Sequence, residues 1–274
     1  DNLEVYGDIG VCMLKGKNWQ KPIMMSEKIN TKDVQSGGTL SNDGTTFFFA
    51  TEKKESLGGS DIWITQRQGD GEWSTPQNMG NVINTKYDDI APFIAMDGKT
   101  LFFCSRGHNS IGGFDIFKTV FDSASGKWSK PVNVGYPLNT AADEMSFSLS
   151  GNGRHAYVST VRPEGLGDKD IYKVTFNDQS VYPFTTLVSG TVNPAAGSKP
   201  ELRQVTLINK ESKKPVAVYK PYFISNHYAL IAKPGTYTLK VEGYGFQPLE
   251  EEITIEASDP LKDIVKDFTV TVSK

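Results

Sequence analysis

One phrase recurs three times in the first two thirds of the chain and constrains the fold more than any other feature. The copies are LGGSDIWI at residues 57–64, IGGFDIFK at residues 111–118 and LGDKDIYK, a looser form, at residues 166–173. Their aspartates, Asp61, Asp115 and Asp170, are 54 and 55 positions apart, and Asp8 lies 53 positions before the first. A fixed period of this length is the signature of a repeat architecture.

Three further markers keep the same period. They are a Trp-x-x-Pro phrase at Trp19, Trp73 and Trp128, an Asn-Thr pair at Asn30, Asn84 and Asn139, and an Asp-Gly or Asn-Gly turn with Gly44, Gly98 and Gly153. The turn predicts a type I′ hairpin, and the apolar run after it, as in TFFFAT, predicts a strand that is buried on both faces. The Gly-Gly-x-Asp-Ile phrase gives a third strand. The Trp-x-x-Pro phrase gives a fourth, which its proline confines to a sheet edge. Four antiparallel strands in each unit, repeated radially, predict an all-β fold built from β-propeller blades.

On these motifs, residues 1–180 resemble the PD40 (WD40-like, TolB-type) β-propeller repeat. The resemblance implies that the repeated aspartates are structural and accept hydrogen bonds from loop amides. The motif residues are Gly58, Gly59, Asp61, Gly112, Gly113, Asp115, Gly167 and Asp170. The third unit departs from the family pattern, because Asp168 replaces the second glycine and Asn152 replaces the hairpin aspartate.

The period stops after about residue 180, and residues 187–274 form a second predicted domain joined near residues 178–187. Alternating apolar residues and turn signals replace the repeat there. The pattern resembles the carboxypeptidase regulatory-like domain, a small transthyretin-like β-sandwich. We expect turns at Pro234-Gly235 and Gly243-Tyr244 on either side of a half-buried strand. The predicted core residues are Val205, Leu207, Tyr237, Leu239 and Val241.

Composition excludes some function classes. A formal net charge of −3 gives no basic field for nucleic acid, and no apolar run is long enough for a transmembrane segment. The two cysteines, Cys12 and Cys104, fall in different units, so we expect two small buried side chains and no bond between them.

The sequence favours binding over catalysis. It contains three histidines, His108, His155 and His227, and no zinc-binding arrangement of them, so neither a cofactor nor a metal is predicted. His108, in a variable loop, is the least poor catalytic candidate, although a loop histidine of this kind is usually solvated. The stretch SNDGTTFFF is superficially similar to the Asp-box of sialidases. Arg106 and Arg162, which such an enzyme would use on a carboxylate, are predicted to be a solvated pair.

A propeller followed by a regulatory-like sandwich resembles OmpA-family envelope proteins of Bacteroidetes-type bacteria, including a component of the type IX secretion system. The resemblance implies a non-catalytic scaffold in the periplasm, associated with the outer membrane, whose partners are other envelope or secretion-system proteins. Lipid and peptidoglycan anchors would lie outside this chain. An alternative is a propeller that binds a small ligand, peptide or glycan at the mouth of its channel. Since residues 1–178 account for about three and a half blades, we also expect further blades before Asp1, six in all by resemblance.

Overall fold

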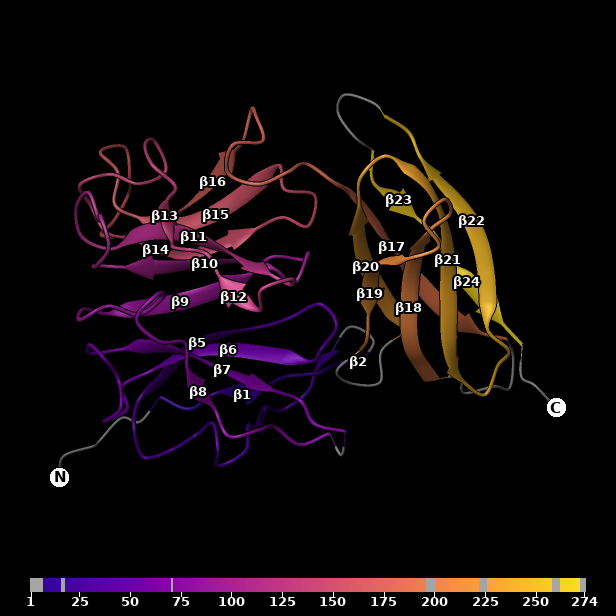
Figure 1. The fold of residues 1–274 in the computed structure, drawn as a ribbon, viewed down its shortest axis with the longest axis horizontal. Helices are drawn as coiled ribbons and strands as arrows, with labels where there is room; N and C mark the ends of the chain where they lie inside the picture. Colours follow the sequence, from indigo (N-terminus) through magenta and orange to yellow (C-terminus); the bar gives the residue numbers. More distant parts are fainter. Residues whose placement is uncertain are drawn as a thin grey trace. The chain divides into compact units, whose positions relative to one another are not determined.

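The computed structural model describes residues 7–15, 18–69, 71–195, 201–221, 226–257 and 262–271. The regular secondary structure of these residues consists of β-strands, with no α-helix among them (Figure 1). The chain separates into two compact units. The first comprises Asp1–Ser41, Thr45–Leu149 and Ala156–Thr175, and the second comprises Asn42–Gly44, Ser150–His155 and Phe176–Lys274. The all-β prediction is confirmed, and each unit is described below by itself.

The first unit contains successive antiparallel sheets of the kind expected for propeller blades. The first complete sheet has the order β5 (Gln35–Leu40), β6 (Thr46–Thr51), β7 (Asp61–Gln66) and β8 (Gln77–Asn78). The second has β9 (Asp89–Ile94), β10 (Thr100–Ser105) and β11 (Asp115–Asp122), with both β12 (Lys127–Trp128) and β13 (Val132–Asn133) on β11. The third has β14 (Glu144–Leu149), β15 (His155–Thr160) and β16 (Asp170–Thr175). Before them lie the short pairs β1 (Gly10–Val11) with β4 (Ile23–Met24) and β2 (Leu14–Lys15) with β3 (Asn18–Trp19). These sheets form an arc of a β-propeller.

The hairpins between first and second strands keep the period but not the predicted turn type. A type I′ turn needs positive φ at both central residues. Here the glycines of the three dipeptides have φ of 66°, 66° and 76°, whereas Asp43, Asp97 and Asn152 are not in the left-handed region. In the second blade, Asp97 Oδ1 instead accepts hydrogen bonds from the backbone N–H groups of Lys99 and Thr100, both at 2.8 Å. The aspartate side chain therefore closes a longer turn.

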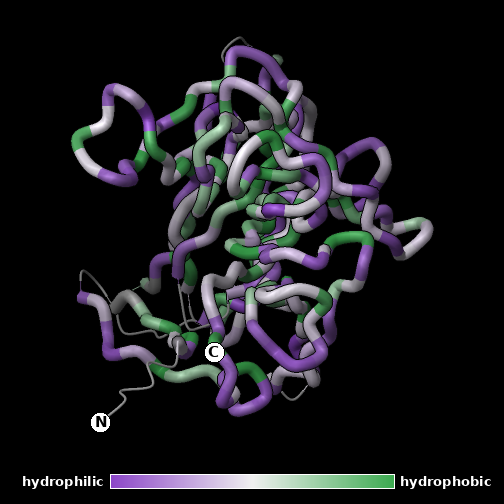
Figure 2. Tube along the Cα trace, turned by 90° about the vertical axis from the view of Figure 1, so that its left-hand side faces the viewer, coloured by the Kyte–Doolittle hydropathy of each residue, from purple (hydrophilic) through white to green (hydrophobic). Residues whose placement is uncertain are grey.

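The second strands carry the core of the first unit, as predicted. All six residues of β10 and the last five of β6 are buried. Aromatic side chains join neighbouring blades. The rings of Phe48 and Trp128 meet edge-on with centroids 5.9 Å apart, and the rings of Phe102 and Phe147 lie 4.7 Å apart. Figure 2 shows short hydrophobic stretches between longer hydrophilic ones along the chain, and the projecting loops contain both kinds.

The second unit is a β-sandwich. One sheet contains β17 (Thr186–Pro194), β20 (His227–Ala232), β23 (Ile264–Val265) and β24 (Phe268–Val270). The other has the order β19 (Pro215–Tyr219), β18 (Glu201–Asn209), β21 (Gly235–Tyr244) and β22 (Leu249–Ile255). All five predicted core residues are buried and share one cluster with Val188 and Leu230 of the facing sheet. The second predicted turn is misplaced, because Gly243 and Tyr244 end β21 and the turn follows at Gly245, with φ of 80°.

Candidate functional site

The loop before each third strand folds around the repeated aspartate. Asp61 is fully buried, and its Oδ2 accepts hydrogen bonds from Leu57 N and from Asn78 Nδ2, both at 2.7 Å. Asp115, also fully buried, repeats both contacts at 2.6 Å, with Ile111 N and Asn133 Nδ2. Each carboxylate therefore joins its own loop to the fourth strand of its blade.

The third aspartate has a different environment. Asp170 is only partly buried, and its Oδ2 accepts from Leu166 N at 2.8 Å. In the part of the chain that the structure describes, β16 has no fourth strand beside it, so the asparagine contact of the other blades has no counterpart.

In the first two copies of the repeated phrase, the first glycine lies against the segment that leads into the next blade, which leaves no room for a side chain. A Cβ added at Gly58 would lie 2.0 Å from the carbonyl oxygen of Tyr87, and one at Gly112 would lie 2.4 Å from that of Ala141. Real Cβ contacts are never this short, so only glycine lets the following segment approach. Nothing lies within 4 Å of a Cβ built at Gly167, the equivalent glycine of the third blade.

The second glycine of each phrase makes room for a carboxylate. At Gly59 and Gly113 an added Cβ would meet Oδ1 of Asp88 and of Asp143, at 2.2 and 1.9 Å. These carboxylates accept hydrogen bonds from the backbone N–H groups of Ser60 and Phe114, at 3.1 and 2.9 Å. The pair therefore forms a contact between adjacent blades. In the third blade Asp168 stands at this position, and such a carboxylate could not approach it.

An asparagine brackets the backbone of the isoleucine after each buried aspartate. Asn84 Oδ1 accepts from Ile62 N at 2.8 Å, and Asn84 Nδ2 donates to Ile62 O at 2.9 Å. Asn139 makes the same two contacts with Ile116, at 2.9 and 2.8 Å. These are the asparagines of the repeated Asn-Thr pairs, so this marker holds the third strand.

Buried polar side chains also begin the first strand of each blade. Gln35, Asp89 and Glu144 occupy equivalent positions and are 3%, 0% and 0% exposed. A threonine four residues earlier donates to each. Thr85 N and Oγ1 both lie within 3.0 Å of Asp89 Oδ2, and Thr140 N and Oγ1 donate to the two oxygens of Glu144 at 2.8 and 2.6 Å. Sequence reasoning missed this row, although the Thr-x-x-x-polar spacing keeps the repeat period.

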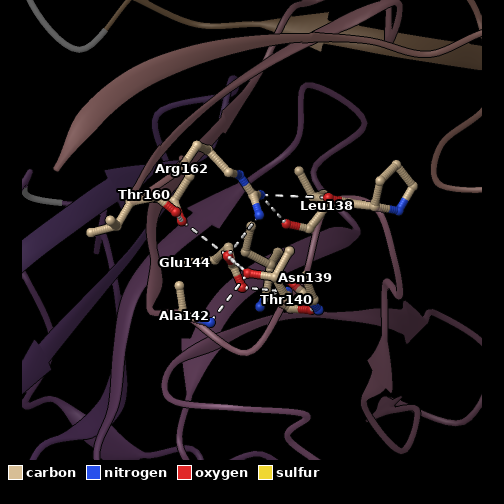
Figure 3. A network of polar contacts seen from close by, with 10 residues as sticks. Leu138, Asn139, Thr140, Ala142, Glu144, Thr160 and Arg162 are labelled. Carbon is tan, nitrogen blue, oxygen red and sulfur yellow. Dashed lines mark hydrogen bonds and ion pairs between the residues drawn. The ribbon is translucent and has the colours of Figure 1, made fainter. Parts of the chain in front are cut away.

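The network around Glu144 includes a cation (Figure 3). Arg162 Nη1 lies 3.5 Å from Glu144 Oε1, and Arg162 Nη2 donates to the carbonyl oxygen of Leu138 at 2.9 Å. The Arg162 side chain is only 17% exposed. The prediction that it is solvated is therefore wrong, because the fully buried carboxylate of Glu144 and a loop carbonyl hold the guanidinium.

In the second blade an imidazole takes the corresponding place. His108 Nε2 lies 2.8 Å from the carbonyl oxygen of Ile83, the repeat equivalent of Leu138. The His108 ring packs 5.2 Å from that of Phe117. Burial raises the pKa of the Asp89 carboxyl, although hydrogen bonds from Ser105 and Thr85 and the nearby charge of His108 oppose the shift. His108 is exposed, as expected of a loop histidine, but it is bound to the loop beside it.

Arg106 contacts residues at both of the junctions between adjacent blades. Its guanidinium lies 3.8 Å from Asp88 and 4.0 Å from Asp143, the two carboxylates that approach the glycine pairs, and stacks 4.2 Å from the Phe114 ring centroid. The side chain is 48% exposed, so these ion pairs are weak individually. Arg106 and Arg162 therefore do not form the predicted pair. Arg106 lies between blades, whereas Arg162 binds Glu144 within its own blade.

The remaining candidates are scattered. His155 and His227 begin β15 and β20, far from each other in sequence and in different sheets. Cys104 is buried, as predicted, and burial raises the pKa of its thiol to about 12. Cys12 is exposed, which contradicts the prediction of a buried side chain. Within the described ranges, no three His, Cys, Asp or Glu side chains gather as a metal site would require, and no helix could span a membrane.

Comparison with known proteins adds a distant likeness. No protein-family model matches the chain, and no curated protein matches it. Among solved structures, TolB from Agrobacterium tumefaciens is 11% identical with a TM-score of 0.42, over 86% of this chain and 68% of that one. TolB from Acinetobacter baumannii is 12% identical with a TM-score of 0.40, over 82% of this chain and 54% of that one. An α-L-arabinofuranosidase from Lactobacillus brevis is 11% identical with a TM-score of 0.37, over 58% of this chain and 57% of that one. At these scores the likeness assigns neither a family nor an activity to this chain.

Proposed function

We propose that this protein is a non-catalytic interaction module of a bacterial cell-envelope complex, located in the periplasm. The observation that carries the proposal is the use of its buried charged groups. Asp61, Asp115 and Glu144 are fully buried and bonded to loops or strands of their own blades, and Arg162 is bound in the same way. Groups that are occupied in holding the scaffold are poor candidates for proton transfer to a substrate.

The loops offer a surface for partners. The loops after the second strands differ in sequence between blades, TEKKESLGGS in one and TVRPEGLGDK in another, on a scaffold whose hydrogen bonds repeat. Variable loops on a constant scaffold are the usual location of binding residues. This arrangement supports protein recognition through the loops and edges of the blades.

The order of a propeller arc followed by a β-sandwich, together with the sequence resemblance to PD40 and regulatory-like domains, supports a narrower assignment. We propose further that the protein acts as OmpA-family envelope proteins such as PorE do, in the type IX secretion system. There it would link outer-membrane components to the cell wall through anchors outside residues 1–274.

A pull-down from solubilised envelope fractions with the whole protein tests the proposal. We expect envelope or secretion-machinery proteins to be recovered and to be lost when the variable loops are exchanged between blades. Recovery of small ligands, peptides or glycans alone would favour the alternative of a ligand site at the channel mouth. Turnover of a substrate that depends on Asp89 or His108 would refute a non-catalytic role.

A further inference from the structure

Among the residues that the structure describes, no fourth strand pairs with the third blade, and the other two blades show which contacts such a strand makes. In both complete blades the third strand pairs with a short fourth strand. Trp63 lies opposite Asn78, and Phe117 lies opposite Asn133. The equivalent residue of β16 is Tyr172, and among the described residues β16 pairs only with β15. The edge of β16 therefore offers backbone groups in the geometry that β8 and β13 satisfy elsewhere.

Side chains of the third blade are also more exposed than their equivalents in the other two blades. Ile171 is 78% exposed, whereas its equivalents Ile62 and Ile116 are each 0% exposed. Tyr157 on the neighbouring strand is 46% exposed, whereas Phe48 and Phe102 at its position are 2% and 0% exposed. In the complete blades the following blade supplies much of this burial, because Phe48 packs with Leu101 and Phe102 packs with Phe147. The exposed positions of the third blade therefore mark a face that neither a following blade nor a segment after a fourth strand covers among the described residues.

The complete blades show which residues the covering segment must carry. An asparagine in the fourth strand donates to the buried aspartate, and a second asparagine, six residues later, brackets the isoleucine backbone. Asn78 and Asn84 do this in one blade, and Asn133 and Asn139 do it in the next. The residue before the second asparagine is apolar. In the first complete blade it is Ile83, which packs in one cluster with Ile62 and with Phe103 and Phe117 of the next blade.

We propose that the edge of β16 binds an extended segment of a partner protein by strand addition, and that this segment carries Pro-x-Asn-x-Gly followed by Ile-Asn or Leu-Asn. The first asparagine donates to Asp170, whose equivalents Asp61 and Asp115 each receive such a bond, and the apolar residue covers Ile171. Strand addition of this kind takes its affinity from main-chain hydrogen bonds and its specificity from alternate side chains. The inference rests on the proposed function, because it names the place where an interaction module would hold its partner.

The blade contacts also restrict the partner. In the two contacts between blades an aspartate lies against the second glycine of the phrase, whereas the third blade has Asp168 there. A carboxylate on the partner would meet both a side chain and a like charge at that point. The segment that follows the bound strand is therefore expected to lack an acidic residue at this contact.

A peptide taken from the chain itself tests the proposal. Residues 127–140, KWSKPVNVGYPLNT, contain the fourth strand of the second blade with both asparagines. A fluorescein-labelled copy is titrated with the whole 274-residue protein and followed by anisotropy. We expect saturable binding, and we expect a copy in which both asparagines are leucine to bind at least about tenfold more weakly, since each would lose bonds to a charged or buried acceptor.

Protein variants locate the site. Asp170→Asn should weaken binding about tenfold, because a bond to a charged acceptor becomes one to a neutral acceptor. Asp168→Asn removes the same charge two residues away and should leave the affinity unchanged. Circular dichroism checks that both variants fold, and NMR shift changes on binding should centre on Tyr172 and Lys173.

Several results would overturn the assignment. One is a failure of the folded protein to bind the peptide at millimolar concentration, and another is binding of the leucine-substituted peptide as tightly as the original peptide. NMR shift changes that lie away from β16 would overturn it as well. Self-association of the chain that Asp170→Asn abolishes would make a second copy, not a different protein, the occupant. Failure here leaves the envelope pull-down unaffected, because that experiment does not depend on which edge or loop is used.

Discussion

Asn78 donates its side-chain N–H to Asp61 across a 2.7 Å contact that joins the fourth strand of a blade to the loop before its third strand. The same relationship recurs in the next blade between Asn133 and Asp115, at 2.6 Å. The loop, the third strand and the edge strand of each blade are therefore fixed by one buried carboxylate. This explains why the repeat keeps an aspartate where a propeller blade could otherwise hold an apolar side chain.

Alanine substitution should reveal this role. Asp61→Ala and Asp115→Ala each leave a loop N–H and an asparagine amide without their acceptor, so each should lower the free energy of unfolding by about 1–3 kcal/mol. Asp170→Ala should cost less, because Asp170 is partly exposed and accepts a bond from Leu166 N alone among those described. Urea denaturation of the three variants measures the difference. A bound cation at any of the three carboxylates would contradict a structural role.

The equivalent glycines Gly112 and Gly167 provide a matched pair. Gly112→Ala would force a Cβ to 2.4 Å from the Ala141 carbonyl oxygen, whereas nothing lies within 4 Å of a Cβ at Gly167. Because the obstacle at Gly112 is backbone, relief requires the blades to move apart, and we expect a loss of about 1–3 kcal/mol. Gly167→Ala should be neutral by thermal melting. Equal effects of the two substitutions would show that the phrase keeps its glycines for a reason other than packing.

The ion pair of Arg162 and Glu144 should show strong coupling. Arg162→Gln leaves a fully buried carboxylate without its cation and should cost about 2–3 kcal/mol, reduced from the cost at a wholly buried pair by the partial exposure of the arginine. Glu144→Gln should cost less, since Gln35 occupies the same position in another blade, where it accepts from Thr31 N and donates to Thr31 Oγ1. In the Glu144→Gln background, Arg162→Gln should have a much smaller effect. A double-mutant cycle in urea measures this coupling, and additive effects would argue against the pair.

The buried carboxyl of Asp89 should make stability depend on pH in a defined direction. Its pKa in the folded protein lies above the ordinary value of 3.8, so between the two values the folded state binds more protons than the unfolded state. The contribution of Asp89 to stability is therefore present below pH 3.8 and is lost as the pH rises through the raised pKa. The Asp89→Asn variant lacks this pH-dependent contribution. The free energy of unfolding of the variant, relative to that of the unchanged protein, should therefore rise as the pH rises across that window. A difference that does not change with pH would contradict the raised pKa.

The 54–55-residue repeat was sufficient to predict the blades. The buried second strands and the core of the sandwich were predictable because they depend on apolar patterns within about ten residues. The contacts between blades were not predictable in this way. Ser60 meets Asp88 and Phe114 meets Asp143 across 28 and 29 residues, and the phrase gives no sign of its partner. Arg162 was misjudged for a related reason: a loop position predicts exposure, whereas the buried acid that holds the guanidinium lies on another strand of the blade.

The buried thiol of Cys104 can report local opening of the second blade, because it reacts only when it becomes accessible to solvent. The thiolate is the reactive form, and a pKa of about 12 together with burial within β10 leaves almost none of it accessible in the folded state. Cys12 is exposed and should react with a maleimide at once. The slower labelling of Cys104 would then measure how often the second blade separates from its neighbours, so each substitution described above can be read as a change in a local opening rate as well as in global stability.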